Sequence, residues 1–439
     1  MKKLYIKLFL LLVVLGLFYS NIFISVNTYK LCLKYPFINK VTRCKKYFAS
    51  KLLLYSWINP KDEKALIGKM GFKKTVISSS NEENPGTLVK ILNFSSKSDK
   101  ELDINDGKER PFYFFSEKYI TPPVYFYNIK DVMVFLGEDT RKFLVFKNGF
   151  YTLLGRENDS LERILPKLIE KENIFYEEQS GDIYFIKDLI ELPEIKNKTI
   201  FFQGDWNLYH IILETSPGLL LINNKLIDYK INLSYDSKSN IDILEALGNP
   251  YITTTEIFSF KNFSELILPS PILENNAHFP NIELMNNLIK KLQRNFSEKA
   301  KVKPLGKKIY ISRSDAFRRK ILNEEELMRY LEKRGFKMVI PGKYNVADQS
   351  KLFEDAEIII GPHGLGLVNM LFSNNLKTVI ELFTITHAPN CYLRTAQIKG
   401  VKNYYGLFHD PADTTTTSWL ADYNVNIPEI LKILDELEK

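Results

Sequence analysis

The segment Phe353-Glu-Asp-Ala-Glu-Ile-Ile-Ile-Gly-Pro-His-Gly-Leu-Gly-Leu-Val-Asn-Met-Leu-Phe372 decides the fold that this sequence predicts. Its apolar run Glu357–Ile360 is typical of a buried strand, and the Gly-Pro pair that follows ends it. The glycines Gly364 and Gly366 then precede a helical pattern. A glycine turn that opens a helix directs backbone N–H groups toward an anion, usually a phosphate, although such turns also serve in packing. We predict a phosphate-binding turn, with His363 as an additional donor.

Strand-like and helix-like segments alternate with short joints on both sides of this turn. The alternation predicts a parallel sheet with covered faces, an α/β Rossmann-like domain, whose ligands bind at the carboxyl ends of the strands. The predicted elements are strands at Lys308–Ser312, Phe336–Ile340, Glu357–Ile360 and Thr378–Leu382, a helix from a capping box at Asn323 to Lys333, a helix over Asn345–Ala356, and a second capping box at Asn426 that opens a terminal helix.

Three arginines follow the first of these strands: Arg313, Arg318 and Arg319. Guanidinium forks match phosphate oxygens in two-point contacts, so we predict a diphosphate clamp; a basic loop facing solvent is the alternative. Glu381 lies on an apolar strand, where a carboxylate is costly to bury without a partner. It is a candidate to accept hydrogen bonds from ribose hydroxyls, or else it pairs with a Lys or Arg.

Another candidate site lies in the N-terminal half, after the predicted strand Ile200–Phe202. Asp205 or Asn207 can cap a helix there that runs to Thr215, and His210 and Glu214 then share one face of it at i and i+4. A carboxylate beside an imidazole orients the ring and raises its pKa, as a general base requires. The alternative is a surface pair without chemistry.

The whole chain is predicted to be organised in five parts. These are an anchor at 1–27, a basic stem at 28–60, an N-terminal α/β domain at 61–298, a C-terminal Rossmann-like domain at 307–425 and a terminal helix at 426–439. Short β-type runs recur in the N-terminal domain, and its polar segment 76–110 is predicted to be a mobile surface loop. The runs are Phe112–Phe115, Val124–Tyr127, Val132–Leu136, Phe143–Phe146, Ile183–Ile186 and Thr199–Phe202.

The apolar run Leu8–Val26 carries no charged residue and nearly spans a hydrocarbon core of ~30 Å at ~1.5 Å rise per residue. Lysines and arginines are more numerous just after this run than before it, which places the body on the cytoplasmic side. We therefore expect a single-pass protein of a bacterial inner membrane, with the type II orientation of the Golgi or endoplasmic reticulum as the alternative.

The composition argues against metal and nucleic-acid sites. Three cysteines and five scattered histidines form no metal-binding spacing, and the net charge of +8 is spread without a basic arm. The sequence lacks a GxxxxGK[ST] motif and an Asp-x-Asp motif, so arginines are expected to stabilise a diphosphate in place of a metal ion.

A set of these motifs, in this order and spacing, resembles glycosyltransferase family 61, which includes plant xylosyl- and arabinosyltransferases and animal O-linked N-acetylglucosaminyltransferases. The resemblance implies a GT-B fold, with two Rossmann-like domains facing a cleft, and metal-independent inverting transfer from a nucleotide-diphosphate sugar. It rests on Arg313, Asn323-Glu324, Gln349, Pro362-His363-Gly364, Gly366-Leu367, Asn369 and Glu381, with an N-terminal echo at Asn207, His210 and Glu214.

The resemblance implies roles for individual residues. His210 or Glu214 would face the acceptor as the catalytic base, and no cofactor other than the donor substrate would be needed. The donor would be bound by Arg313, Arg318, Arg319, Asn323, Gln349, His363, Gly364, Gly366, Asn369 and Glu381. The acceptor partner would be a glycan or glycoprotein hydroxyl. The alternatives are a phosphate-ester hydrolase or kinase, and a non-catalytic membrane-anchored protein that binds sugar or assists polysaccharide assembly.

We expect Leu8–Val26 to remain attached to the mature protein, because the run is long and Ser25-Val-Asn27 is a poor signal-peptidase site. N-terminal sequencing of the purified native protein checks this. A mature chain that begins near residue 27 would show that the segment is a cleaved signal peptide.

Overall fold

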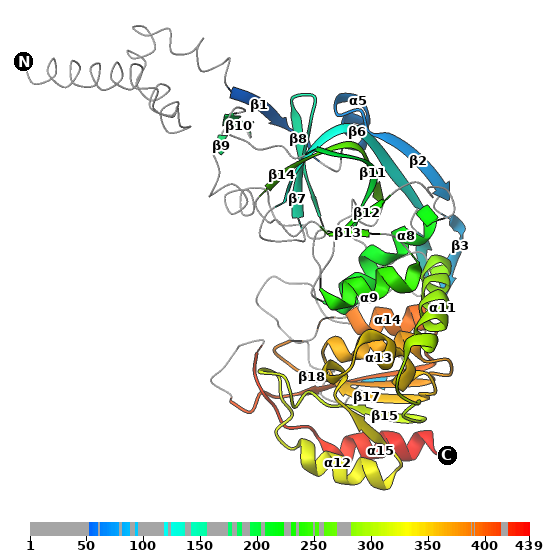
Figure 1. The fold of residues 1–439 in the computed structure, drawn as a ribbon. Helices are drawn as coiled ribbons and strands as arrows, with labels where there is room; N and C mark the ends of the chain where they lie inside the picture. The colour runs from blue at the N-terminus through cyan, green and yellow to red at the C-terminus, as the bar shows by residue number, and fades with distance from the viewer. Residues whose placement is uncertain are drawn as a thin grey trace, which may run out of the picture.

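The protein has a mixed α/β fold with two main sheets and a layer of helices between them (Figure 1). Its computed structural model describes residues 52–59, 62–78, 81–87, 93–94, 118–121, 124–136, 142–155, 174–177, 182–186, 194–202, 207–223, 230–233, 237–248, 251–253, 259–269, 282–387, 389, 391–413 and 420–439. The predicted anchor and the predicted strand Phe112–Phe115 lie outside these residues. Within them, no helix combines the length and apolarity needed to cross a membrane.

The C-terminal sheet is parallel, as predicted. Its strands, in spatial order, are β16 (Lys337–Val339), β15 (Lys308–Ile311), β17 (Ile358–Pro362), β18 (Thr378–Thr384), β19 (Asn403–His409) and β4 (Asn93–Phe94). Numbered by their order along the chain, the first five strands lie side by side in the order 2-1-3-4-5. In such a sheet the connections from β15 and β17 leave in opposite directions, and ligands bind in the crevice where they diverge. Arg313 follows β15 and the glycine turn follows β17, so both lie at this switch point.

Helices cover both faces of the C-terminal sheet, because successive side chains of a buried strand point to opposite faces. Ile360 of β17 packs in a cluster with α12 (Glu324–Lys333) and the terminal helix α15 (Ile427–Leu437). Its neighbour Ile359 packs in a second cluster with α13 (Val346–Phe353) and α14 (Cys391–Lys399). The sequence predicted neither α14 nor β19.

The N-terminal sheet combines a parallel part with antiparallel additions. The parallel part has the order β13 (Tyr251–Thr253), β12 (Lys230–Leu233), β11 (Glu194–Phe202), β14 (Ser259–Pro269). Numbered by their order along the chain, these four strands lie side by side in the order 3-2-1-4. This part of the sheet therefore has its own switch point, between β11 and β14. The other strands are β6 (Val124–Leu136), β2 (Lys73–Ser78), β7 (Lys142–Lys147), β8 (Phe150–Gly155), β1 (Leu52–Trp57), β10 (Asp182–Ile186) and β9 (Ile174–Glu177).

Several N-terminal predictions need correction. The runs Val124–Tyr127 and Val132–Leu136 form one strand, β6, which passes through Asp131 at a φ of 49°. Asp tolerates this left-handed conformation better than most residues do. Residues of the predicted stem form β1, and the predicted loop 76–110 contributes to β2, to β4 and to a small separate sheet. That sheet pairs β3 (Asn81–Thr87) with β5 (Lys118–Thr121).

The helix after β11 begins where predicted and continues further. It comprises α7 (Leu208–His210), a π-helical segment η3 (Ile211–Thr215) and α8 (Ser216–Asn223). Asn207 caps it by accepting a hydrogen bond from the Tyr209 N–H at 3.0 Å. The helix passes the predicted end at Thr215, and Pro217 falls just after the π-helical segment, where the regular i to i−4 hydrogen bonding is already interrupted.

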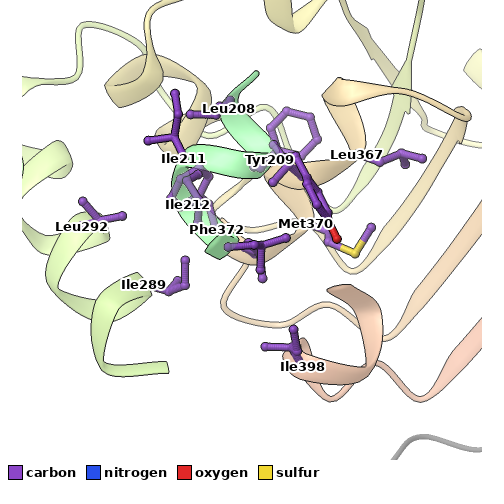
Figure 2. Packing of buried hydrophobic residues seen from close by; sticks show 14 of the residues in the cluster. Leu208, Tyr209, Ile211, Ile212, Ile289, Leu292, Leu367, Met370, Phe372 and Ile398 are labelled. Carbon is purple, nitrogen blue, oxygen red and sulfur yellow. The ribbon is translucent and has the colours of Figure 1, made fainter. Parts of the chain in front are cut away.

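One hydrophobic core crosses the predicted domain boundary at Lys299–Gly306. It joins α7, η3 and α9 (Lys238–Leu247) of the N-terminal half to the C-terminal sheet, with α11 (Ile282–Lys299) between them. Figure 2 shows side chains of α7 and η3 beside α11 and beside η5 (Leu365–Phe372), which follows the glycine turn. Labelled there are Leu208, Tyr209, Ile211, Ile212, Ile289, Leu292, Leu367, Met370, Phe372 and Ile398.

The two predicted capping boxes differ in outcome. Asn426 accepts a hydrogen bond from the Glu429 N–H at 3.3 Å and caps α15, as predicted. Asn323 stands at the N-cap position of α12 but makes no capping hydrogen bond. Its side chain instead donates to the Val425 carbonyl at 3.0 Å and accepts from the Val425 N–H at 2.9 Å. A partner 102 residues away has therefore replaced the local cap.

We expect Phe296→Ala to lower the free energy of unfolding of both halves together, by about 3–5 kcal/mol. Phe296 is 1% exposed on α11, and its ring meets that of Phe372 in η5 at a centroid distance of 6.2 Å. Chemical denaturation followed by circular dichroism measures the loss. Phe317→Ala is the matched control, because Phe317 is 83% exposed. Two transitions, one of them unaffected by Phe296→Ala, would show that the core is not shared.

Candidate functional site

The predicted phosphate turn is in close contact with Arg313. A Cβ placed on Gly364 would lie 1.8 Å from Arg313 Nη1 and 2.8 Å from its Cζ, so the guanidinium rests directly on the glycine backbone. Gly364 has a φ of 162°, which is extended backbone, so space and not conformation requires glycine there. Gly366 serves packing: its Cβ would lie 2.8 Å from Ile311 Cγ2 and 3.2 Å from Pro341 Cγ.

The segment after the turn is the 3-10 helix η5, not the predicted α-helix. The Leu367 N–H donates to the Gly364 carbonyl at 3.0 Å, which closes the first tight turn. Asn369, fully buried, donates to the Gln349 Oε1 at 2.9 Å and to the Gly366 carbonyl at 3.0 Å. We predicted Gln349 and Asn369 as substrate-binding residues. Their mutual bond fastens η5 to α13, while the Asn369 Oδ1 is buried without a hydrogen-bond partner among the described residues.

The three predicted arginines gather at the end of β15. Burial and the nearby charges of Arg313 and Arg318 lower the pKa of Arg319 to about 10. Burial also lowers the pKa of Arg313. Arg319 adopts a φ of 54°, and its backbone N–H donates to the Leu420 carbonyl at 3.1 Å. The fold thus holds three like charges close together against their repulsion, which favours an anionic ligand.

One atom of this cluster points to a ligand independently of the charges. The Nε of Arg313 is buried and has no hydrogen-bond partner in the part of the chain that the structure describes. A buried donor without a partner is costly and calls for an explanation such as an absent ligand. The Arg313 side chain is therefore the leading candidate to contact an anion above the glycine turn.

Hydrogen bonds that the sequence did not predict hold the loop that carries Arg313. Glu324 accepts from the Tyr310 hydroxyl at 2.8 Å and from the Ser312 hydroxyl at 3.0 Å. The Ser312 Oγ in turn accepts from the Ser314 N–H at 3.1 Å. The neighbouring Asn323, predicted to bind substrate, is engaged by Val425 and so supports the loop from outside the site.

His363 and Glu381 form a buried pair beside the arginines. Glu381 is 0% exposed; its Oε1 lies 2.6 Å from His363 Nδ1, and its Oε2 accepts from the Tyr404 hydroxyl. Burial raises the pKa of Glu381 well above its usual value, and burial lowers that of His363 well below its usual value. We expected Glu381 to accept ribose hydroxyls, and this needs correction because both oxygens are buried and engaged within the protein.

His210 and Glu214 make the predicted contact in the N-terminal half. Glu214 Oε1 lies 2.8 Å from His210 Nδ1, with side chains 6% and 22% exposed respectively. The pair stands where the helix passes from α7 into the π-helical segment, and such segments are frequent at functional sites. The more exposed imidazole can receive a proton while the buried carboxylate orients it.

Aromatic rings connect this pair to the C-terminal turn. The ring of Tyr209 meets those of His210 at 5.3 Å and of Tyr392 at 5.6 Å between centroids. Tyr392, on α14, meets His363 at 5.1 Å. This chain of contacts brings the two candidate centres to one region of the molecule. The sequence carried no signal for Tyr392, since α14 was not predicted.

The geometry therefore defines an α/β protein with an arginine-bearing glycine turn at the switch point of one sheet and a His–Glu pair from the other half. Among the described residues, no group of three or more His, Cys, Asp or Glu side chains is arranged to hold a metal ion. Residues 208–380 match the family Glycosyltransferase 61. This range contains the His210–Glu214 pair, the arginines and the glycine turn, and it ends one residue before Glu381. This match, over part of the chain, confirms the resemblance predicted from its motifs.

Comparison with individual proteins adds relatives over shorter stretches. The chain is 33% identical over 155 residues to the EGF domain-specific O-linked N-acetylglucosamine transferase of Drosophila melanogaster, covering 33% of this chain and 29% of that protein. It is 38% identical over 95 residues to the protein of the same name from Xenopus laevis, covering 20% and 18%. The chain thus spans less than a third of the length of these curated relatives.

A solved structure shows a weaker likeness. It is the crystal structure of the bacterial iron-containing dodecameric glycosyltransferase TibC from enterotoxigenic E. coli H10407. The likeness covers 73% of this chain and 87% of that one, at 10% identity and a TM-score of 0.27. A score this low supports no conclusion about the present chain.

We expect Gly364→Ala to weaken the binding of inorganic pyrophosphate by roughly ten- to a hundredfold, because the new methyl group displaces the Arg313 guanidinium. The melting temperature should change little, since the displaced atoms are the far end of a flexible side chain. Titration calorimetry and a melting curve give both values, and Arg313→Lys should weaken binding similarly. Gly68→Ala is the control, because a Cβ there meets nothing within 4 Å. Unchanged affinity in Gly364→Ala would remove the turn from the anion site.

Proposed function

We propose that this protein is an inverting, metal-independent glycosyltransferase that moves a sugar from a nucleotide-diphosphate sugar to a hydroxyl group of a glycan or glycoprotein. The observation that carries the proposal is the arginine cluster around the glycine turn, with the unpartnered Nε of Arg313 among the described residues. The match of residues 208–380 to Glycosyltransferase 61 supports a transferase of this class. The two switch points, one in each sheet, support a GT-B arrangement with the acceptor on the N-terminal side.

In the proposed reaction the acceptor oxygen attacks the anomeric carbon of the donor from the face opposite the diphosphate. The new C–O bond forms while the bond from that carbon to the diphosphate oxygen breaks, so the configuration inverts. His210, oriented by Glu214 at 2.8 Å, takes the proton of the acceptor hydroxyl. The nucleoside diphosphate leaves with the electron pair of the broken bond.

Arginines take the part that a divalent cation plays in other transferases. Negative charge grows on the diphosphate as it leaves, and donors placed there before the reaction stabilise the transition state. Arg313 is fixed through the bonds of Glu324 to Tyr310 and Ser312. His363 and Arg319 lie beside it. The absence of an Asp-x-Asp motif supports a site that works without a metal ion.

The relatives suggest where to begin with substrates. Two of them are named EGF domain-specific O-linked N-acetylglucosamine transferases, so N-acetylglucosamine nucleotides are the first donors to assay here, and a protein hydroxyl the first acceptor. We further propose that Leu8–Val26 anchors the protein in a membrane, with the body on the cytoplasmic side of a bacterial inner membrane. A type II orientation in the Golgi is the second possibility.

The second candidate is a non-catalytic membrane-anchored protein that binds sugar nucleotides during polysaccharide assembly. The arginine–glycine site would persist in such a protein, whereas the His210–Glu214 pair would have no role in turnover. A panel of nucleotide sugars, screened by thermal shift, identifies a donor in either case, because a ligand that binds the folded state raises its melting temperature.

With that donor, we expect His210→Ala to lower turnover by about 10²–10⁴-fold while the thermal shift caused by the donor persists. Glu214→Gln should lower turnover by a smaller factor, since the ring keeps a hydrogen-bonding neighbour. Glu245→Gln is the matched control; its side chain is 48% exposed and pairs with Lys299. Transfer should also survive EDTA. Wild-type turnover in both site variants would favour the non-catalytic protein, and restoration of EDTA-sensitive activity by Mn²⁺ would overturn the metal-independent mechanism.

A further inference from the structure

The contact between His363 and Glu381 fixes which ring nitrogen can meet a ligand. Glu381 Oε1 lies 2.6 Å from His363 Nδ1. The other ring nitrogen, Nε2, has no hydrogen-bond partner within the described part of the chain, and 8% of the His363 side chain remains exposed. His363 immediately precedes Gly364, the glycine on which the Arg313 guanidinium lies. Of the two ring nitrogens, Nε2 is therefore the one left to contact a ligand of the anion site.

The state of that nitrogen depends on where the shared proton resides. A carboxylate that accepts from Nδ1–H leaves neutral Nε2 as a lone-pair acceptor, which repels phosphate oxygens. A neutral carboxylic acid that donates to Nδ1 requires the ring proton to sit on Nε2, which then donates to phosphate. The same contact distance is thus compatible with two opposite functions, and the surroundings decide between them.

The surroundings favour the neutral acid. Glu381 is 0% exposed in the middle of the sheet, where an ionised carboxylate is expensive. Its Oε2 accepts from the Tyr404 hydroxyl, as the carbonyl oxygen of a neutral acid would, which leaves Oε1 for the proton. The ring of His363 stacks on Phe383 at 5.4 Å, and His387 meets it at 5.2 Å. Burial of this ring removes it from water and so disfavours an imidazolium.

The charged and titratable neighbours act in the same direction on the ring. His387, Arg319 and Arg313 lower the pKa of His363 in addition to the effect of its burial. Arg319 alone acts to lower the pKa of Glu381, and burial outweighs it. Among the described residues, the ring of Tyr392 also contacts His363, and the hydroxyl of Tyr404 donates to Glu381.

We propose that Glu381 is a positioning residue which, as a neutral acid, donates its proton to His363 Nδ1 and so keeps Nε2–H available to the leaving diphosphate. The inference rests on the proposed transfer from a nucleotide-diphosphate sugar and adds a residue to it. In the ground state the imidazole is uncharged, and its Nε2–H bond strengthens as negative charge develops on the leaving oxygen. Glu381 itself does not touch the substrate.

The amide variant Glu381→Gln provides the sharpest test, because it imitates a neutral acid and cannot imitate a carboxylate. Its NH₂ group can donate to His363 Nδ1 while its carbonyl accepts from Tyr404. Glu381→Leu removes both bonds at similar volume. Glu357→Gln is the control, since Glu357 pairs with Lys307 and Lys377 at the opposite end of the sheet.

Two readouts on the full-length protein decide the matter. Selective ¹⁵N labelling of histidine gives five residues to resolve, and His363→Asn identifies the signals of His363. Steady-state kinetics with the identified donor give kcat and KM. We expect a neutral ring protonated at Nε2 in both the wild type and Glu381→Gln, with kcat in Glu381→Gln within about threefold of the wild type. In Glu381→Leu we expect kcat to fall by about 10–100-fold with a smaller change in KM.

A ring protonated at Nδ1 in the wild type, or a Glu381→Gln variant whose kcat falls as far as that of Glu381→Leu, would overturn the inference. If Glu381→Leu fails to fold, the comparison of wild type and Glu381→Gln still decides. Failure of the proposed function looks different: the wild type would transfer no sugar, while the ¹⁵N spectrum would still report the tautomer. Addition of inorganic pyrophosphate should then shift the Nε2 signal if the anion site exists.

Discussion

The contact of the Arg313 guanidinium with the backbone of Gly364 is the constraint on which the rest of the site depends. It places a cation at the switch point of the C-terminal sheet, at a distance that no residue with a Cβ would allow. The contact requires β15 and β17 to be adjacent, and their parallel register provides this. It also requires the loop after β15 to be held, which Ser312 and Glu324 accomplish. Sheet topology, loop hydrogen bonds and a single glycine thus converge on one position for one charge.

A second constraint brings the N-terminal half to this position. The helix that carries His210 is packed by its apolar face into the same core as η5 and α14, so it is held by the C-terminal sheet as much as by its own. Tyr209 and Tyr392 form the last contact of that core before the candidate site. Because protein interiors are close-packed, a shift of α7 is transmitted to η5 and to the glycine turn. The His–Glu pair and the arginines therefore form one arrangement, even though they come from separate sheets.

The sequence predicts the parts of this arrangement that depend on local pattern. The alternation of strands and helices between residues 307 and 383 is regular, and the parallel sheet follows from it. The His210–Glu214 contact follows from helical spacing alone. What failed depends on partners distant in the chain: the side chain of Asn323 has the composition of a cap, but Val425 engages it. Glu381 is visible as a carboxylate on an apolar strand, yet nothing local indicates that the parallel strands β17 and β19 bring His363 and Tyr404 to it.

The two glycines of the turn show why a motif does not define its own chemistry. Gly364 leaves room for a guanidinium, whereas Gly366 leaves room for Ile311 and Pro341. A reading that assigns both to phosphate contact treats one packing residue as a binding residue. The charges nearby supply the distinction that the motif lacks. Of the three arginines, Arg319 acts on the carboxyl group of Glu381, yet burial still raises the pKa of that group well above its usual value. Asp315 offsets part of the charge on Arg313, and an anion that contacts the Arg313 guanidinium would approach beside Gly364.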